Sequence, residues 1–207
     1  MINTTLPQSN TAPACTALGS GVWLAFRHIA GTSAPAVLPP AAGAHLLSVE
    51  FCRRGRHALP AGDYCTIAAD GHAAVSMTAA GADDYYPGAV YEGLQFWIDP
   101  DAQTGSGFLA LMGLDVHGII NYFCASGPYY CPMGDDLAAL VDELWREFDV
   151  SGYASPGELR YAVVRLLYML LQLPYADQMA WYPRAQVDLV RDAETLMLAD
   201  LSVRHTA

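Results

Sequence analysis

The chain has no lysine, and its ten arginines stand against 21 aspartate and glutamate residues, for a net charge of −11. Nucleic acids are bound chiefly by cationic side chains, so this composition excludes a DNA-binding surface within the chain. Long apolar runs are also absent. The longest helical one, 161–173, is too short to span a bilayer, and no basic region with an apolar core opens the chain. We expect a soluble, cytoplasmic protein with no membrane partner.

Several signatures of chemistry are missing as well. Five cysteines form an odd set without a Cys-x-x-Cys pair, which favours reduced thiols over a disulfide framework or a zinc site. There is no Gly-x-Ser-x-Gly nucleophile elbow and no glycine-rich phosphate loop with its lysine. We therefore expect no catalytic residue and no cofactor.

What the sequence does contain is enough apolar material for a core, with 53% hydrophobic residues in 207. The charges are unevenly spread. Residues 1–62 carry four arginines and Glu50, residues 63–158 carry fifteen acids and Arg146, and the remainder is balanced. The first third of this acidic chain therefore carries a net positive charge, four arginines against one glutamate.

The first half has the short, turn-bounded segments of an all-β region. Residues 1–20 are polar and without periodicity, which predicts a flexible arm. Strands are expected at 22–27, 45–53, 64–68, 73–78 and 93–98, with Asp70-Gly71 as one of the turns. Leu47, Val49 and Phe51 fall on one face of the second strand. Such a series favours a sandwich or a small barrel, because closing a sheet removes its exposed edges.

Helical periodicity begins after Pro100. Helices are expected at 108–112, 116–123 and 136–149, with a brief strand at 128–132. A helix at 158–173 is apolar around almost its whole circumference, and a domain of this size can cover only one side of it. We therefore expect a homodimer, the alternative being a central helix inside one subunit. The expected interface comprises Tyr161, Arg165, Leu166, Met169, Leu170 and Leu173.

The last stretch, 184–207, has the pattern of an amphipathic helix, and no further segment follows to cover its apolar side. Apolar residues stand near helical spacing at Val187, Val190, Leu196 and Leu201. Two interpretations are open at this point. The segment is either a surface helix with a frayed tail or the beginning of a further domain.

An ordered set of short phrases spans nearly everything after residue 20. It comprises Val22-Trp23-Leu24, Phe51-Cys52-Arg53-Arg54-Gly55-Arg56, Tyr86-Pro87, Ile98-Asp99, Phe123-Cys124, Arg184-Ala185-Gln186-Val187 and Leu201-Ser202-Val203-Arg204-His205-Thr206. In order and spacing the set resembles the sensor part of AraC-type (AraC/XylS) transcriptional regulators.

The resemblance implies an α+β fold with four parts. They are a flexible arm at 1–20, a cupin-like, jelly-roll-like β-barrel that binds a small-molecule effector at 21–100, an antiparallel helical dimerisation region at 101–182, and a linker with the start of a DNA-binding domain at 183–207. DNA would be a partner only through helix-turn-helix motifs beyond Ala207. The resemblance does not transfer ligand contacts, because Asp70-Gly71-His72 and Glu92 depart from the pattern of these relatives.

A cupin-like fold leaves two other functions open, a metal-dependent enzyme and a stand-alone ligand-binding module. Metal-dependent cupins resemble one another in a His-x-His followed by Glu, because a divalent metal needs converging imidazole and carboxylate ligands. None of the six histidines is paired in that way. Only His57 and His72 with Glu92 could meet across strands, so we expect no metal.

Candidates for the effector site are aromatic residues and a few polar groups on the predicted strands, because small-molecule pockets combine apolar walls with few polar contacts. They are Trp23, Phe51, Arg53, Tyr64, Tyr91, Glu92, Phe96 and Trp97. Phe96 and Trp97 are adjacent and must point to opposite faces. Tyr91, Glu92 and Trp97 are preferred, because aromatic and polar residues concentrate between Tyr86 and Trp97.

Overall fold

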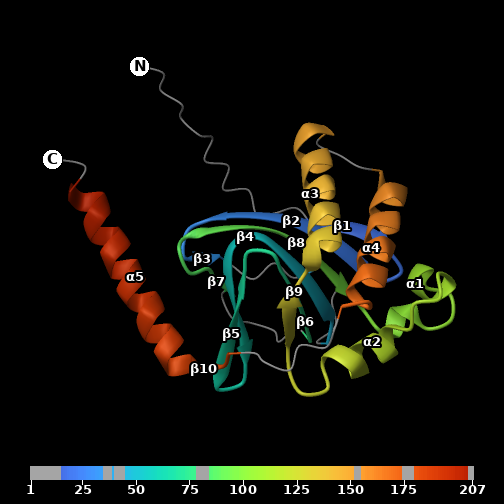
Figure 1. The fold of residues 1–207 in the computed structure, drawn as a ribbon, viewed down its shortest axis with the longest axis horizontal. Coiled ribbons are helices and arrows are strands. Elements are labelled where there is room, and N and C mark those ends of the chain that lie inside the picture. Colours follow the sequence, from blue (N-terminus) through green and yellow to red (C-terminus); the bar gives the residue numbers. More distant parts are fainter. Residues whose placement is uncertain are drawn as a thin grey trace.

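The computed structural model describes residues 15–34, 39, 45–77, 84–151, 155–173 and 180–204, the side chains of 148–151 and 200–204 excepted. These residues form an α+β fold that combines a ten-stranded antiparallel sheet with five α-helices (Figure 1). The strands are β1 (Thr16–Gly19), β2 (Val22–Ala30), β3 (Ser33–Ala34), β4 (Leu47–Ala61), β5 (Tyr64–Ala69), β6 (His72–Met77), β7 (Asp84–Tyr85), β8 (Val90–Ile98), β9 (Tyr129–Pro132) and β10 (Tyr182–Pro183). The helices are α1 (Phe108–Leu111), α2 (Val116–Phe123), α3 (Gly134–Ser151), α4 (Pro156–Leu170) and α5 (Arg184–Arg204), with a 3-10 turn, η1, at Asp101–Gln103.

The centre of the sheet is one long hairpin bent at its middle. β4 returns through a two-residue turn at 62–63, where Gly62 has a φ of +60°. The second half of β4 then pairs with β5, and its first half pairs with β6. Asp70-Gly71 therefore does not fold β5 and β6 back on each other as a hairpin, but interrupts a strand that follows β4 along its whole length.

The bend is fixed by Gly55. Its φ is +91°, a conformation that glycine adopts without strain, and a side chain there would collide with the carbonyl oxygen of Val90. The pairing of β4 with β8 shifts register between Cys52 and Arg54, as at a β-bulge. Bulges bend strands, so the two halves of β4 belong to two layers that face each other.

The expectation of a closed barrel is wrong. The strand order along the main path is β1-β2-β8-β4-β5-β10, and among the described residues it does not return on itself. β6 with β9, and β7 with β3, join β4 as side branches. The sheet also takes strands from outside 21–100, because β1, β9 and β10 belong to it. The proposed arm at 1–20 lies mostly outside the described residues.

Strand alternation gives the sheet two unlike faces. In β4, Leu47, Val49 and Phe51 are fully buried in the large hydrophobic core, and this confirms the face predicted for them. The same core takes its other side from α2, α3 and α4, which cover this face (Figure 1). Ser48, Glu50 and Cys52 point to the opposite face, toward the second half of β4 and β5. Polar side chains are thereby buried between the two layers.

Helices α3 and α4 lie side by side and run in opposite directions (Figure 1). α4 begins with a capping box, in which Ser155 Oγ accepts the Glu158 N–H and the Glu158 carboxylate accepts the Ser155 N–H, and Pro156 occupies the first turn. Of the interface predicted on α4, Leu166 and Leu170 are fully buried within the chain itself, whereas Tyr161 is 62% exposed. Those two leucines belong to the core of this chain. They are therefore covered within one subunit and are not exposed to a partner.

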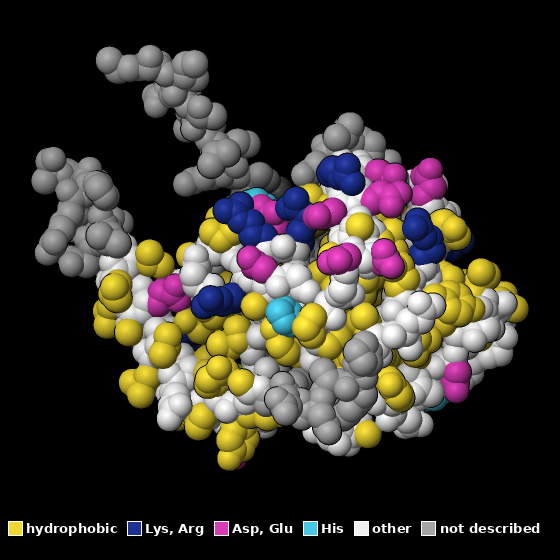
Figure 2. All heavy atoms as spheres, viewed as in Figure 1, with side chains coloured by type: hydrophobic (Ala, Val, Ile, Leu, Met, Phe, Trp, Pro, Cys, Tyr) yellow, Lys and Arg dark blue, Asp and Glu magenta, His cyan; other side chains and the backbone are white. Residues whose placement is uncertain are grey.

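Helix α5 lies at the edge of the molecule, next to β10 and β5 (Figure 1). Val187 packs against Ala58, Cys65 and Tyr85, while Val190 and Leu196, predicted on the same stripe, are exposed. Apolar side chains accordingly run along the outer side of this helix in Figure 2. Within the described part of the chain, none of the helices combines the length and hydropathy that crossing a membrane requires.

Candidate functional site

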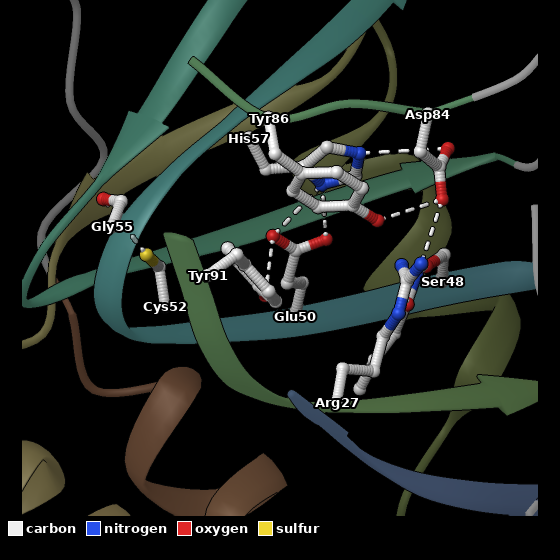
Figure 3. Close-up of polar contacts among 10 residues, drawn as sticks. Arg27, Ser48, Glu50, Cys52, Gly55, His57, Asp84, Tyr86 and Tyr91 are labelled. Carbon is white, nitrogen blue, oxygen red and sulfur yellow. Dashed lines mark hydrogen bonds and ion pairs between the residues drawn. The ribbon is translucent and has the colours of Figure 1, made fainter. Parts of the chain in front are cut away.

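The most unusual feature of the interior is a group of charged side chains buried between the two layers of the sheet. Arg27 comes from β2, Glu50 and His57 from the two halves of β4, and Asp84 from β7 (Figure 3). Arg27, Glu50 and His57 are each at least 97% buried, and Asp84 is half-buried. With Tyr86, Tyr91, Gln95 and Ser48, which hydrogen-bond to them or to one another, they form what we call the buried charged cluster.

His57 stands between two carboxylates. Its Nδ1 lies 2.8 Å and 3.0 Å from the two oxygens of Glu50, and Nε2 lies 3.5 Å from Asp84 Oδ1. Tyr91 donates its hydroxyl to Glu50 Oε1 at 2.8 Å. Glu50 reaches His57 because the bend in β4 turns residue 57 back over residue 50, seven positions earlier.

Arg27 closes the other side of the cluster. Its guanidinium donates from Nη1 to Gln95 Oε1 at 2.8 Å and from Nη2 to Asp84 Oδ2 at 2.9 Å. Asp84 Oδ2 also accepts the Tyr86 hydroxyl at 3.0 Å. Among the residues that the structure describes, two buried nitrogens lack a hydrogen-bond partner: Arg27 Nε, and His57 Nε2, whose approach to Asp84 Oδ1 at 3.5 Å is long for a hydrogen bond. Buried donors of this kind are rare and call for an explanation, such as a water or a ligand.

Aromatic rings wall the cluster. The His57 and Tyr86 rings stack at a centroid distance of 4.8 Å, and Tyr91 lies 5.1 Å from Tyr86 (Figure 3). Arg27 lies over the Tyr86 ring at 5.4 Å. Gly93 makes room for this packing, because a Cβ at that position would collide with the Tyr91 side chain. Aromatic rings thus enclose the charged groups on the side of Tyr86 and Tyr91.

The environment fixes the protonation states. Burial alone would lower the pKa of His57, but the charges of Glu50 and Asp84 raise that pKa to about 9. Burial opposes ionisation of Glu50 and Asp84, yet His57 and Arg27 hold the pKa of both carboxyl groups below its usual range. Burial raises the pKa of Tyr86 and Tyr91. At neutral pH the cluster therefore holds two cations and two anions and is balanced.

The structure separates the side chains predicted for the effector site. Only Tyr91 belongs to the buried charged cluster. Phe51 and Phe96 lie in the core under the helices, Trp97 is buried with Ala25 and Leu46 with Trp23 beside it, and Tyr64 is 53% exposed.

Arg53 and Glu92, also predicted for the effector site, pair with each other, and Arg53 alone contacts α3. Arg53 Nη1 lies 2.5 Å from Glu92 Oε2, and Arg53 Nε lies 2.7 Å from Asp142 Oδ1. The guanidinium also lies over the Trp145 ring at 5.5 Å. These contacts fasten β4 to α3 on the side away from the cluster.

The sequence interpretation missed Arg27, Glu50, His57 and Asp84. One signal for Glu50 was available: once Leu47, Val49 and Phe51 are assigned to the core, alternation puts Ser48, Glu50 and Cys52 together on the other face. Asp84 had no such signal, because β7 is only two residues long and has no periodicity.

No group of three or more His, Cys, Asp or Glu side chains is arranged to hold a metal ion within the described part of the chain. His57 and His72 do not converge with Glu92, because His72 stacks on Tyr130 at 4.5 Å while His57 faces Glu50. No known protein family matches the sequence, no curated protein is significantly similar to it, and no solved structure is significantly similar to the fold. A functional assignment therefore depends on the geometry and chemistry of the cluster alone.

Proposed function

We propose that this chain is the effector-binding and dimerisation region of an AraC-type transcriptional regulator, and that the buried charged cluster recognises its small-molecule effector between the two layers of a cupin-like, jelly-roll-like fold. The observation that carries the proposal is the burial of Arg27, Glu50 and His57 beside the half-buried Asp84, with two donor nitrogens that have no hydrogen-bond partner among the described residues. Burying charges costs free energy that hydrophobic residues would not cost, and groups with shifted pKa values cluster at functional sites.

The protonation states favour binding over proton transfer. A general acid or base works best when its pKa lies near the operating pH. His57 has a pKa of about 9, and its carboxylate neighbours are held in the ionised form. Fixed charges and hydroxyl groups of this kind suit hydrogen bonding to a polar ligand.

A route for the signal leads from the cluster to the C-terminal helix. Successive side chains of residues 84–86 alternate: Asp84 and Tyr86 contact the cluster, whereas Tyr85 faces α5. Glu194 of α5 accepts the Tyr85 hydroxyl and the Gly88 N–H, both at 2.8 Å. An effector that moves Asp84 or Tyr86 would change how α5 is held, in proportion to its preference for one arrangement over the other.

The binding proposal is tested by ligand-induced thermal shift. A library of polar metabolites is screened against the wild-type chain, and the best compound is then measured on Tyr91→Phe, which removes only the hydroxyl that contacts Glu50. We expect the affinity to fall by about tenfold. Tyr64→Phe is the matched control, because Tyr64 is exposed on β5, and it should bind as the wild type does. An unchanged affinity in Tyr91→Phe would remove the cluster from the site.

The regulator part of the proposal is tested on the native reading frame. Two helix-turn-helix patterns in about a hundred residues following Ala207 are expected. Metal analysis of the purified chain tests the enzyme alternative, because stoichiometric iron, manganese, nickel or zinc would favour a metal-dependent cupin-like enzyme.

A further inference from the structure

The densest positive charge in the sequence lies at the bend of β4. Three of the ten arginines stand within four consecutive residues, Arg53, Arg54 and Arg56 with Gly55 between them. Arg53 is committed to Glu92 and Asp142, as described above. The other two play no part in the buried charged cluster, and in a chain of net charge −11 their presence side by side needs its own explanation.

Arg54 and Arg56 line one hollow in the surface, with a volume of about 410 Å³. Its other walls are Gly55, Ala69, Asp70, Pro87, Gly88 and Val90, which come from the bend of β4, the end of β5 and the turn before β8. The two arginines stand on either side of the bend at Gly55, and both contribute to the wall of the hollow. A hollow of this size is in the range that takes a small organic molecule.

Among the residues that the structure describes, no carboxylate oxygen lies within hydrogen-bonding distance of Arg54 or Arg56. The nearest carboxylate oxygen to Arg54 belongs to Glu92, at 3.7 Å, and that carboxylate already holds Arg53 at 2.5 Å. Arg56 makes no hydrogen bond and no ion pair with any residue that the structure describes. Both side chains are therefore available to an anion from solution.

The acidic groups at the hollow are already engaged. Asp70 lies in its wall and accepts the Gly55 N–H, and Glu194, at its rim, accepts the Gly88 N–H and the Tyr85 hydroxyl. Ala69, Pro87 and Val90 supply apolar surface beside the two guanidinium groups. The hollow thus combines two guanidinium groups, of which only Arg54 has a carboxylate nearby, at 3.7 Å, with a small apolar wall.

We propose that this hollow binds a small organic oxyanion, with Arg54 and Arg56 holding its carboxylate or phosphate group and the apolar wall contacting its body. Planar guanidinium groups bind oxyanions through paired hydrogen bonds, which makes arginine the suitable residue for this task. The site is separate from the buried charged cluster and does not depend on the function proposed above. A carboxylate and a phosphate offer the same oxygen acceptors, so the experiment must distinguish them.

The experiment is calorimetric titration of the wild-type chain with sodium hexanoate, sodium acetate and inorganic phosphate, at constant ionic strength set with sodium chloride. We expect saturable binding of at least one oxyanion. Hexanoate tighter than acetate and phosphate identifies a carboxylate with an apolar body, and phosphate tighter than both identifies a phosphate group. The absence of saturable binding for all three overturns the proposal.

Variants then locate the site. Replacing both side chains, Arg54→Gln with Arg56→Gln, is expected to weaken binding by about tenfold or more. Arg146→Gln removes one arginine charge from the exposed face of α3 and should bind as the wild type does. Arg54→Lys with Arg56→Lys keeps the charge and the fold but loses the paired geometry, and should give an intermediate affinity. Equal affinities in wild type and both double variants overturn the assignment.

Discussion

His57 has carboxylates near both of its ring nitrogens, so the positive charge of its ring stabilises the fold. Glu50 holds Nδ1 at 2.8 Å and Asp84 approaches Nε2 at 3.5 Å, with no solvent contact of consequence. Removing the proton from this ring leaves two buried carboxylates with Arg27 as their only remaining cation in the cluster. The stability of the folded protein therefore depends on pH through the protonation of this one residue.

The direction of that dependence follows from the pKa of His57, about 9 when folded against an ordinary value of 6.5. Because the folded state binds the proton more tightly, the stabilisation is complete below pH 6.5 and is lost as the pH rises through 9. We expect the free energy of unfolding, measured by urea titration, to fall by a few kcal/mol between pH 6.5 and 9.

Two variants check the origin of this slope. His57→Gln is expected to be less stable and to lose most of the pH dependence between 6.5 and 9, because it has no titrating ring. His72→Gln, on β6 with its ring against Tyr130, should keep the wild-type slope. A wild-type protein equally stable at pH 6.5 and 9 would contradict the proposed charge of His57.

The carboxyl groups of Glu50 and Asp84 act in the opposite pH range. Their pKa values are lowered in the folded state, so the stability that they contribute is present above their ordinary pKa and is lost in acid.

At the scale of elements, β4 shows what local sequence predicts and what it does not. The strand at 45–53 was expected, and alternation correctly assigned Leu47, Val49 and Phe51 to one buried face. Its continuation to Ala61 was not expected, because Gly55 marks a bend that only the pairing with β8 reveals. The cluster was missed for the same reason, since Glu50 meets His57 only across that bend.

Helices were predicted more fully than strands, because their periodicity is local. The helix at 116–123 is found with the expected bounds, and α1, α3 and α4 occupy the predicted regions with ends shifted by a few residues. Strands β3, β7 and β10, each two residues long, had no pattern to find. They are defined by partners far away in the sequence, such as Tyr182 opposite Cys65.

A second prediction concerns the attachment of α5. Glu194 makes two hydrogen bonds to the segment that also carries Asp84 and Tyr86, so Glu194→Ala should loosen the helix. Hydrogen exchange of backbone amides in α5 after Val187 is expected to accelerate by about tenfold, which corresponds to the loss of one or two hydrogen bonds to a charged group.

The matched control for this helix is Asp192→Ala, an exposed acid two positions away whose only described partner is Arg191 at 3.4 Å. It should leave exchange in α5 close to the wild-type rate, because it does not contact the sheet. Equal acceleration in both variants would show that helix propensity, rather than the contact with Tyr85 and Gly88, controls the exchange.

At the scale of the whole molecule, one face remains apolar after folding. Side chains at the outer side of α4 and the end of α1 are exposed, and the Tyr168 hydroxyl joins the two elements by donating to the Met112 carbonyl at 2.5 Å. The exposed apolar residues of this face are Leu111, Met112, Tyr161, Tyr168 and Leu171. We propose that dimerisation uses this face, with Tyr161 and Arg165 from the predicted interface, rather than Leu166 and Leu170.

Sedimentation velocity tests the dimer. We expect a dimer at micromolar concentration and a shift to monomer in Tyr161→Glu, because a buried charge opposes an apolar interface. Tyr64→Glu changes another exposed tyrosine, on β5, and should remain dimeric. A monomeric wild-type chain at that concentration would refute dimerisation.

The bend in β4 has a further consequence for how the molecule loses its structure. Since residues 47–52 pair in one layer and residues 56–61 in the other, a single strand serves both layers. Neither layer can unfold completely while the other keeps this strand in place. The hydrogen bonds between Glu50 and His57 also connect the two halves of the strand across the bend. The two layers should therefore melt together as one cooperative unit, although the chain that builds them is spread over almost the whole sequence.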